Sequence, residues 1–234
     1  MPTIIAIDTS CDLASVALLR GGKVDSLSSS GVQTHSQTVL PMLQQLLSQA
    51  GMTFKNCDAI AFGAGPGSFT GVRTACGVAQ GLALGADLPV IPVVTLEAMA
   101  EACREVSQAM DVLAVLDARM HEVYWAQYRY DETGEWQTVA APALSPSSSV
   151  KAAGPVVACG NGLSAYASSF SGSLFAKGSL PEIMPHAVHV AKLAERAFLR
   201  GQMVPARDAQ PIYLRNKVAL TVAERAAEAG KKAA

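Results

Sequence analysis

The chain has 234 residues, of which 50% are hydrophobic and 16% are charged. A chain of this composition buries a sizeable core and is not intrinsically disordered. Its most apolar stretch, residues 81–100, carries Asp87, Glu97 and two prolines. No apolar run of about 18 residues is therefore available for a transmembrane helix, and we expect no membrane span.

The beginning of the chain and the cysteines indicate a compartment. No basic segment precedes the first apolar run, which stops at Asp8. The sequence thus predicts no secretory signal and a cytoplasmic protein. The five cysteines are scattered, without a C-x-x-C pair, which is typical of reduced, buried thiols.

The formal net charge of −1 is unevenly distributed. Residues 1–120 hold 6 basic and 10 acidic residues, whereas residues 121–234 hold 12 and 9. From Lys192 onward there are 9 basic and 4 acidic residues. This basic tail either contacts RNA phosphates or is a solvated helix face with a frayed end, and we favour the second interpretation.

Apolar periodicity predicts the elements in chain order. Three strands, at residues 3–8, 14–20 and 23–28, form an antiparallel meander with a Gly21-Gly22 turn. Five alternating elements follow: a helix at 36–50, a strand at 58–62, a helix at 72–84, a strand at 90–94 and a helix from Thr95 to about 106, with Thr95 as N-cap. This alternation favours a parallel crossover unit.

The second half predicts strands at 112–117, 121–130 and 156–159, and a helix at 186–200. The Pro/Ser-rich residues 142–149 are a candidate boundary between lobes. Taking the chain as a whole, we assign residues 1–105 to a first lobe and residues 106–234 to a second, reduced lobe with the basic tail.

Two segments have the composition of a phosphate site. The glycine-rich turn Gly63-Ala-Gly-Pro-Gly-Ser-Phe-Thr-Gly71 lies between a strand and a helix, where backbone N–H groups converge. It matches neither a P-loop nor a Rossmann motif. Asp8-Thr9-Ser10 ends the first strand with a carboxylate and two hydroxyls, which suit a hydrated metal and phosphate. Alternatively, the glycines only permit a tight turn and Asp8 only caps one.

Searches for other chemistry find little. His186 and His189 share a helix face, but no H-E-x-x-H pattern completes a zinc site. A G-x-S-x-G nucleophile elbow is absent as well. We therefore predict no metal site and no catalytic residue.

Six ordered motifs together resemble the TsaB (YeaZ) family, over residues 4 to about 219. They are Ile4-Ile-Ala-Ile-Asp-Thr-Ser10; His35-Ser-Gln37 with Leu40-Pro-Met42; Gly65-Pro-Gly-Ser-Phe-Thr-Gly-Val-Arg73; Gln80-Gly-Leu82; Asp117-Ala-Arg-Met120 with Glu122-Val-Tyr124; and Pro211-Ile-Tyr-Leu-Arg215. The resemblance implies an α/β, actin-like ATPase (ribonuclease H-like) fold with two lobes, the second one reduced. It also implies kinship with TsaD, the catalytic paralogue, whose metal-binding histidines correspond here to Thr95 and Met99, neither of which is a suitable ligand.

The resemblance further implies a non-catalytic scaffold that binds TsaD and the small ATPase TsaE and is required for threonylcarbamoylation of tRNA adenosine 37. It would form a homodimer when alone and reach tRNA only through the complex, and it would hold no cofactor unless ATP or ADP binds at a complex interface. The vestigial phosphate site would comprise Asp8, Thr9, Ser10, Gly65, Gly67, Ser68 and Thr70. The partner interface would comprise Gln37, Leu40, Leu43, Leu47, Val72, Arg73, Ala75, Cys76, Ala79 and Gln80. Two alternatives stay open: a small-molecule kinase or ATPase of the same fold and, with less support, a glycoprotease-like peptidase.

Overall fold

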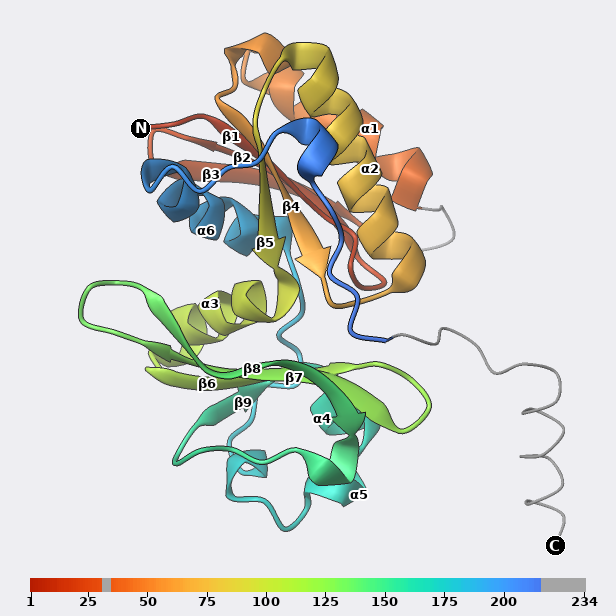
Figure 1. Cartoon of the computed structure of the whole chain (residues 1–234), viewed down its shortest axis with the longest axis vertical. Coiled ribbons are helices and arrows are strands. Elements are labelled where there is room, and N and C mark those ends of the chain that lie inside the picture. Colours follow the sequence, from red (N-terminus) through yellow and green to blue (C-terminus); the bar gives the residue numbers. More distant parts are fainter. Residues whose placement is uncertain (31–34, 216–234) are drawn as a thin grey trace, which may run out of the picture.

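The computed structural model describes residues 1–30 and 35–215, which form two lobes, each built around one sheet (Figure 1). The first sheet has the strand order β3-β2-β1-β4-β5. Its strands are β1 (Ile4–Asp8), β2 (Ala14–Arg20), β3 (Lys23–Ser29), β4 (Ala59–Gly65) and β5 (Val90–Val94). The first three form the antiparallel meander, and β4 and β5 join β1 in parallel.

Helices cover both faces of this sheet. On β1, Ile5 and Ile7 face the core formed with α1 (His35–Gln49) and α2 (Phe69–Ala86). Ile4 and Ala6 face α6 (Ala187–Leu199) on the opposite side. Because successive side chains of a strand point to opposite faces, a central strand with helices on both sides is apolar throughout.

The second sheet has the order β8-β7-β6-β9. Its strands are β6 (Asp111–Asp117), β7 (Glu122–Tyr130), β8 (Trp136–Pro146) and β9 (Val157–Cys159). One face packs against α3 (Thr95–Ser107), and the other against α4 (Gly162–Ala165) and α5 (Ala167–Phe170). Short 3-10 turns lie at η1 (Phe54–Asn56), η2 (Ser147–Ser149), η3 (Leu174–Ala176) and η4 (Ala206–Asp208).

The strand order and directions confirm the predicted α/β, actin-like fold with two lobes. The predicted elements recur with shifted ends. In particular, the helix predicted at 72–84 begins at Phe69, because the Ser68 side chain caps it by accepting a hydrogen bond from the Gly71 N–H. None of the helices within the described ranges is long and apolar enough to cross a membrane.

The Pro/Ser-rich residues 142–149 are not a boundary between lobes, contrary to the prediction. Pro142 lies inside β8, an edge strand that pairs with β7. The pairing shifts register between Trp125 and Gln127 of β7, opposite Pro142. Proline lacks the N–H that a ladder needs, so an edge strand at an irregularity accommodates it.

The helix α6 lies on the first sheet, although the predicted division assigns residues 106–234 to the second lobe. Val190, Ala191 and Ala194 of α6 are buried against Ile4 and Ala17 of the first sheet. The chain therefore returns to the first lobe after the second sheet is complete (Figure 1).

Candidate functional site

The carboxylate of Asp8 lies at the end of β1 and is enclosed, with 0% of the residue exposed. Its Oδ1 accepts hydrogen bonds from the Ser10 backbone N–H at 3.0 Å and from the Ser10 hydroxyl at 2.8 Å. Its Oδ2 has no partner among the described residues. Burial raises the pKa of this carboxyl to about 6, although the two bonds from Ser10 oppose the rise.

The glycine-rich turn packs directly on this motif. The Ser68 N–H donates to the Ser10 carbonyl at 2.7 Å, and the Thr9 hydroxyl donates to the Gly71 carbonyl at 2.7 Å. A Cβ on Gly67 would lie 2.4 Å from the Ser10 carbonyl oxygen, and one on Gly71 would lie 1.8 Å from that of Thr9. Glycine is therefore required at both positions for the two backbones to approach.

The other two glycines of the turn have local roles as well. A Cβ on Gly63 would lie 1.9 Å from Asp8 Oδ2. Gly65 has φ +106, and its N–H donates to the Thr95 hydroxyl at 3.0 Å. Thr95 does not act as the predicted N-cap of α3, because that position is Val94 and the Thr95 hydroxyl is turned toward β4 instead.

A cleft of about 320 Å³ lies between the lobes beside this turn. Of the predicted phosphate residues, Ser10, Gly67 and Ser68 line it, whereas Asp8, Thr9, Gly65 and Thr70 do not. The second lobe contributes Asp117, Arg119 and Asn161 to the opposite wall. The hydroxyls and backbone of the turn thus border the cleft, but the Asp8 carboxylate does not.

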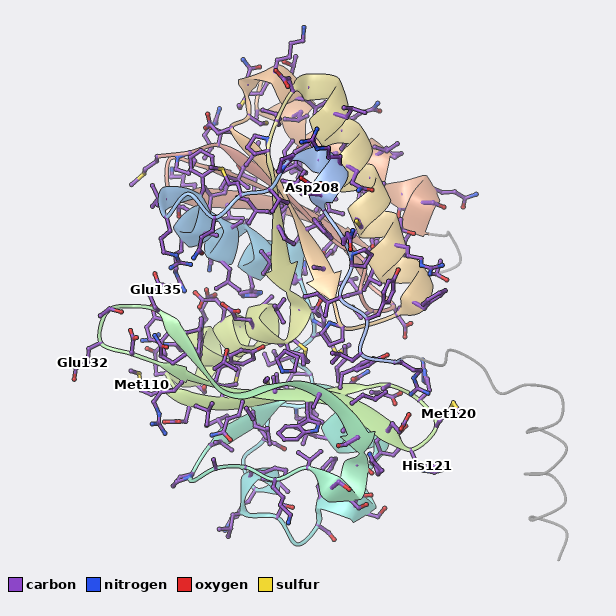
Figure 2. All side chains as sticks on the ribbon, in the orientation of Figure 1. Met110, Met120, His121, Glu132, Glu135 and Asp208 are labelled. Carbon is purple, nitrogen blue, oxygen red and sulfur yellow. The ribbon has the colours of Figure 1, made fainter. Side chains whose placement is uncertain are left out.

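The β6–β7 hairpin forms one end of the cleft. Arg119, Met120 and His121 at its tip have φ values of 63, 58 and 60, a left-handed conformation that is strained for residues other than glycine. Figure 2 shows Met120 and His121 at this tip. Arg119 is 78% exposed and forms an ion pair with Asp117 at 3.2 Å.

Residues 209–215, which we call the strap, run from α2 to this hairpin. At the α2 end, the Gln80 amide donates to the Ala209 carbonyl at 2.9 Å, and the Arg73 Nε donates to the Tyr213 hydroxyl at 2.7 Å. The Arg73 guanidinium also stacks on Phe69, 3.7 Å from the ring centroid. The strap therefore occupies one flank of α2.

Arg215 binds the other end of the strap to the second lobe. Its Nη2 donates to the Ala118 carbonyl at 3.0 Å and forms an ion pair with Glu122 at 2.6 Å. Its Nη1 lies 3.3 Å from the Met120 sulfur. One arginine thus contacts both sides of the strained hairpin tip.

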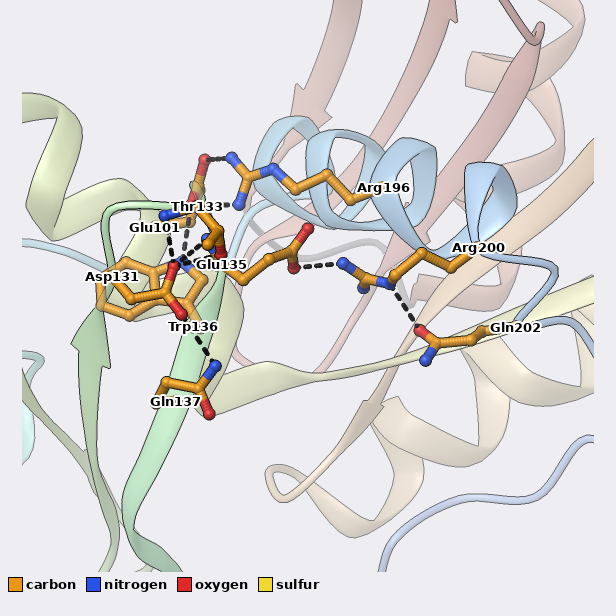
Figure 3. Close-up of polar contacts among 9 residues, drawn as sticks. All are labelled: Glu101, Asp131, Thr133, Glu135, Trp136, Gln137, Arg196, Arg200 and Gln202. Atoms are coloured by element: carbon orange, nitrogen blue, oxygen red, sulfur yellow. Dashed lines mark hydrogen bonds and ion pairs between the residues drawn. The ribbon is translucent and has the colours of Figure 1, made fainter.

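A second set of contacts ties the lobes together at the opposite edge (Figure 3). Arg196 of α6 forms an ion pair with Glu101 of α3, which also accepts a hydrogen bond from the Trp136 indole at 2.7 Å. Arg200, the C-cap residue that follows α6, forms an ion pair with Glu135 in the β7–β8 connection. The two lobes are therefore connected by charged contacts on both sides of the molecule.

Most of the predicted partner interface is inaccessible. Six of its members are buried in the core of this chain: Leu43, Leu47, Val72, Ala75, Cys76 and Ala79. Gln37, Leu40 and Arg73 are exposed, and Gln80 is half-buried. In this chain by itself, the accessible part of the predicted interface is therefore limited to these four residues, two on each helix.

The accessible face of α2 is lined by glycines instead. Gly77, Gly81 and Gly85 are exposed, and a Cβ on any of them would meet nothing within 4 Å. Leu84 beside them is 79% exposed. Residues four apart lie on the same side of a helix, so these glycines form one shallow strip that another backbone can approach closely.

Metal-binding side chains do not gather in the described part of the chain, where no group of three or more His, Cys, Asp or Glu side chains is suitably placed. Burial lowers the pKa of both His186 and His189, and His189 lies 3.4 Å from Glu105. All five cysteines are free and buried, which confirms that prediction. The end of the predicted basic tail, residues 216–234, lies outside the described residues.

Comparisons with known proteins give a consistent result. The family model described as "TsaD: tRNA N6-adenosine threonylcarbamoyltransferase" matches residues 28–219. The "tRNA threonylcarbamoyladenosine biosynthesis protein TsaB" of Haemophilus influenzae is 38% identical over 226 residues, which are 92% of this chain and 94% of that protein. Its Escherichia coli namesake is 40% identical over 223 residues, 92% and 96% of the two chains. The solved structure "YeaZ from Pseudomonas aeruginosa" matches with a TM-score of 0.83 at 38% identity and covers 92% of this chain and 100% of that one.

Proposed function

Because this chain belongs to the TsaB (YeaZ) family, within the wider group that the TsaD model describes, we propose that it serves as a non-catalytic subunit in the biosynthesis of threonylcarbamoyladenosine in tRNA. In this role it binds a TsaD partner and the ATPase TsaE, forms a homodimer when alone, and reaches tRNA through the complex in the cytoplasm. The names of its relatives support a role in this pathway, and the geometry of the chain supports a non-catalytic role within it.

The side chains that would have to contact a substrate or a metal are instead buried or hydrogen-bonded within this chain. The Asp8 carboxylate is enclosed, and the Thr9 hydroxyl donates a hydrogen bond to the Gly71 carbonyl. At the positions that correspond to the metal ligands of TsaD, the Thr95 hydroxyl accepts from Gly65, and Met99 lies in the apolar core. A general acid, base or ligand must lie within reach of the reacting group, so these residues favour a subunit that works by binding.

The contacts between the lobes support the same conclusion. Enzymes of two lobes commonly close around a substrate by hinge motion. Here the strap spans one edge, and the ion pairs of Arg196 and Arg200 span the other. Closing the cleft would require these contacts to break, which favours a rigid body over a hinged one.

The observation that carries the proposal is the glycine strip of α2. A helix packs most closely where small residues let the backbones approach, and Gly77, Gly81 and Gly85 leave that space open on the outer face. Burying this strip with the exposed Leu84 would remove apolar surface from water. We therefore assign the TsaD contact to this strip.

Substituting Gly81→Leu tests the assignment. The leucine side chain would fill the strip, so we expect loss of co-elution with TsaD and loss of tRNA modification in a reconstituted mixture with TsaE. The same change removes a mid-helix glycine, so the free energy of unfolding should rise by about 0.5–1 kcal/mol. A variant that binds less although it is more stable cannot be explained by misfolding.

Gly172→Leu is the matched control, because Gly172 is exposed on the second lobe and its Cβ would also meet nothing within 4 Å. It should bind TsaD like the natural chain. If the natural chain neither binds TsaD nor alters modification, the proposed function fails. If it does both and Gly81→Leu is unaffected, only the assigned surface is wrong.

The cleft favours a second candidate, nucleotide binding with kinase or ATPase activity, or nucleotide held at a complex interface. Ser10, Gly67 and Ser68 border it at the beginning of α2, where a helix N-terminus favours an anion. Calorimetry with ATP and Mg²⁺ on the isolated chain tests this. Micromolar binding that Ser68→Ala weakens, with turnover lost on Asp8→Ala, would favour an enzyme over a scaffold.

A further inference from the structure

Met120 combines solvent exposure with a direct contact to a charged donor. It stands at the tip of the β6–β7 hairpin, where 53% of the residue is exposed (Figure 2). Nη1 of Arg215, the last residue of the strap, donates to its sulfur at 3.3 Å. An exposed thioether is open to oxidants in solution, and an oxygen added to this sulfur would lie beside a guanidinium.

The contact between Arg215 and Met120 is weak for a charged donor. A guanidinium forms its strongest hydrogen bonds with oxygen acceptors, above all charged ones, whereas a thioether sulfur is a weak acceptor. The other terminal nitrogen of Arg215 shows the difference, because Nη2 binds the Ala118 carbonyl at 3.0 Å and the Glu122 carboxylate at 2.6 Å. Nη1 would therefore form a stronger bond to an oxygen than it forms to the sulfur.

The backbone of the hairpin tip makes the strength of this bond important. Arg119, Met120 and His121 have φ values of 63, 58 and 60, and such a conformation persists only where neighbouring contacts hold it. Within the hairpin, the Asp117 carboxylate accepts a hydrogen bond from the Arg119 N–H at 2.7 Å. From the strap, Arg215 contacts the tip on both sides. A stronger bond from Arg215 should therefore make local opening of the tip rarer.

We propose that Met120 is a site of reversible oxidation by small peroxides, and that its sulfoxide strengthens the connection between the strap and the hairpin. The Met120 sulfur attacks one oxygen of hydrogen peroxide; the S–O bond forms, the O–O bond breaks, and the leaving hydroxide takes the proton of the transferred oxygen to form water. The sulfur loses two electrons and the peroxide gains them. The sulfoxide oxygen then accepts a hydrogen bond from Arg215 Nη1. A thiol-dependent sulfoxide reductase reverses the step, releasing the oxygen as water while two thiols become a disulfide.

Two other methionines of the chain serve as internal references. Met110 is similarly exposed, at 43%, but its sulfur lies 4.0 Å from the nearest nitrogen of Arg104 and does not contact the strap. It precedes β6, whereas Met120 follows that strand, so the two sulfurs lie at opposite ends of it. Met99 is fully buried. Exposure therefore predicts oxidation of Met110 and Met120 but not of Met99, and an effect on the hairpin tip from Met120 alone.

The oxidation would act on a connection between the two lobes. At the first lobe, the Ile212 N–H of the strap donates to the Ala64 carbonyl at the end of β4, at 2.7 Å. At the second lobe, the strap ends on the hairpin through Arg215, and both Arg215 and Met120 line the cleft. A sulfoxide at Met120 would thus hold the mouth of the cleft more firmly. This inference does not depend on the proposed function, since it needs neither TsaD nor tRNA.

Peptide mapping and amide hydrogen exchange on the natural full-length chain test the proposal. The folded protein is treated with hydrogen peroxide, the reaction is stopped with free methionine, and mass spectrometry gives the rate of oxygen addition at each methionine. Met120 should gain one oxygen many times faster than Met99. Exchange at residues 118–122 should then slow by about tenfold, the factor expected for one added hydrogen bond to a charged group. Methionine sulfoxide reductase with dithiothreitol should restore both the mass and the exchange rate.

Two variants separate this contact from general oxidation. In Met120→Leu, peroxide still oxidises Met110, and exchange at residues 118–122 should stay as it was before treatment. In Arg215→Leu, Met120 is still oxidised, but its sulfoxide has no charged donor beside it, so exchange should not slow. Each protein is compared with its own untreated form, so a loss of stability that a substitution itself causes does not enter the result.

Three outcomes would overturn the proposal. The first is oxidation of Met120 in the folded chain no faster than that of buried Met99. The second is a Met120 sulfoxide that leaves exchange at residues 118–122 unchanged or speeds it, because the oxygen would then not bind Arg215. The third is an equal slowing in Arg215→Leu, which would show that the effect arises without the strap.

Discussion

Replacing Asp8 with asparagine isolates the cost of burying a carboxylate at the end of β1. Asparagine keeps an oxygen for the two hydrogen bonds from Ser10 and removes the charge. The pKa of Asp8 is about 6 in the folded chain, against 3.8 for an exposed aspartate. Because each pKa unit corresponds to 1.36 kcal/mol, the difference amounts to about 3 kcal/mol.

The sign follows from which state binds the proton more tightly. The folded chain does, so the stabilising effect of the protonated carboxyl is complete below pH 3.8 and disappears as the pH rises through about 6. The natural chain should therefore lose about 3 kcal/mol of unfolding free energy over this window through Asp8 alone. Asp8→Asn cannot lose it, and any cost of its unpaired amide is independent of pH.

The assay is urea unfolding of both proteins between pH 4 and pH 8. The difference in unfolding free energy, variant minus natural chain, should rise by about 2.4 kcal/mol from pH 4 to pH 8, because part of the total is already lost at pH 4. All other titrating groups cancel in that difference. Asp25→Asn, on the exposed side of β3, controls for the change in net charge. A difference that stays flat across the range would refute the reasoning, because it would mean that the folded chain lets Asp8 ionise freely.

Three further predictions concern the turn, the lobe contacts and the strap. Gly71→Ala should destabilise the chain by more than about 3 kcal/mol on thermal or urea unfolding, because its Cβ would lie 1.8 Å from the Thr9 carbonyl oxygen. The control Gly77→Ala, in the same helix, should stabilise the chain by up to about 1 kcal/mol. Equal effects of the two substitutions would contradict the close approach of Gly71 to Thr9. Burial raises the pKa of Glu97 to about 7, against the opposing charges of Arg196 and Arg200. The melting temperature of Glu97→Gln should therefore equal that of the natural chain near pH 5 and exceed it at pH 8. A variant that is less stable at pH 8 would show that the charge is stabilising. Arg215→Gln should speed amide hydrogen exchange at residues 118–122 and lower the free energy of unfolding by about 1–2 kcal/mol. Unchanged exchange would mean that the hairpin tip keeps its strained conformation without the contacts of Arg215.

The sequence predicts local features of this protein well because their causes are local. The continuous apolar run from Ile4 to Ile7 and the Gly21-Gly22 turn determine the meander within a few residues. The glycine-rich turn and Asp8 were also recognised as unusual, and the structure brings them together. What could not be read from the sequence was their relationship, in which the glycines accommodate backbone carbonyls.

Features that depend on distant parts of the chain were missed. The apolar residues of α2 lie on more than one side, so periodicity did not separate the core face, with Ala75 and Ala79, from the outer face, with Gly77 and Gly81. The Pro211–Arg215 motif was noted, but its role depends on contacts such as that between Arg73 and Tyr213, 140 residues apart. Composition and spacing carry no signal of that kind.

Because α6 returns to the first sheet, the first lobe cannot finish folding until residues 187–199 have been synthesised. The Ala187 N–H donates to the Ser15 hydroxyl oxygen across 172 residues, and the outer face of β1 stays uncovered until α6 docks. During synthesis the meander leaves the ribosome long before α6, and the apolar face that α6 will cover stays exposed in the meantime. Contacts of such long range also slow the folding of the finished chain. We therefore expect a nascent chain that lacks α6 to depend on a chaperone, while the second lobe, whose strands are contiguous in sequence, folds ahead of the lobe that precedes it.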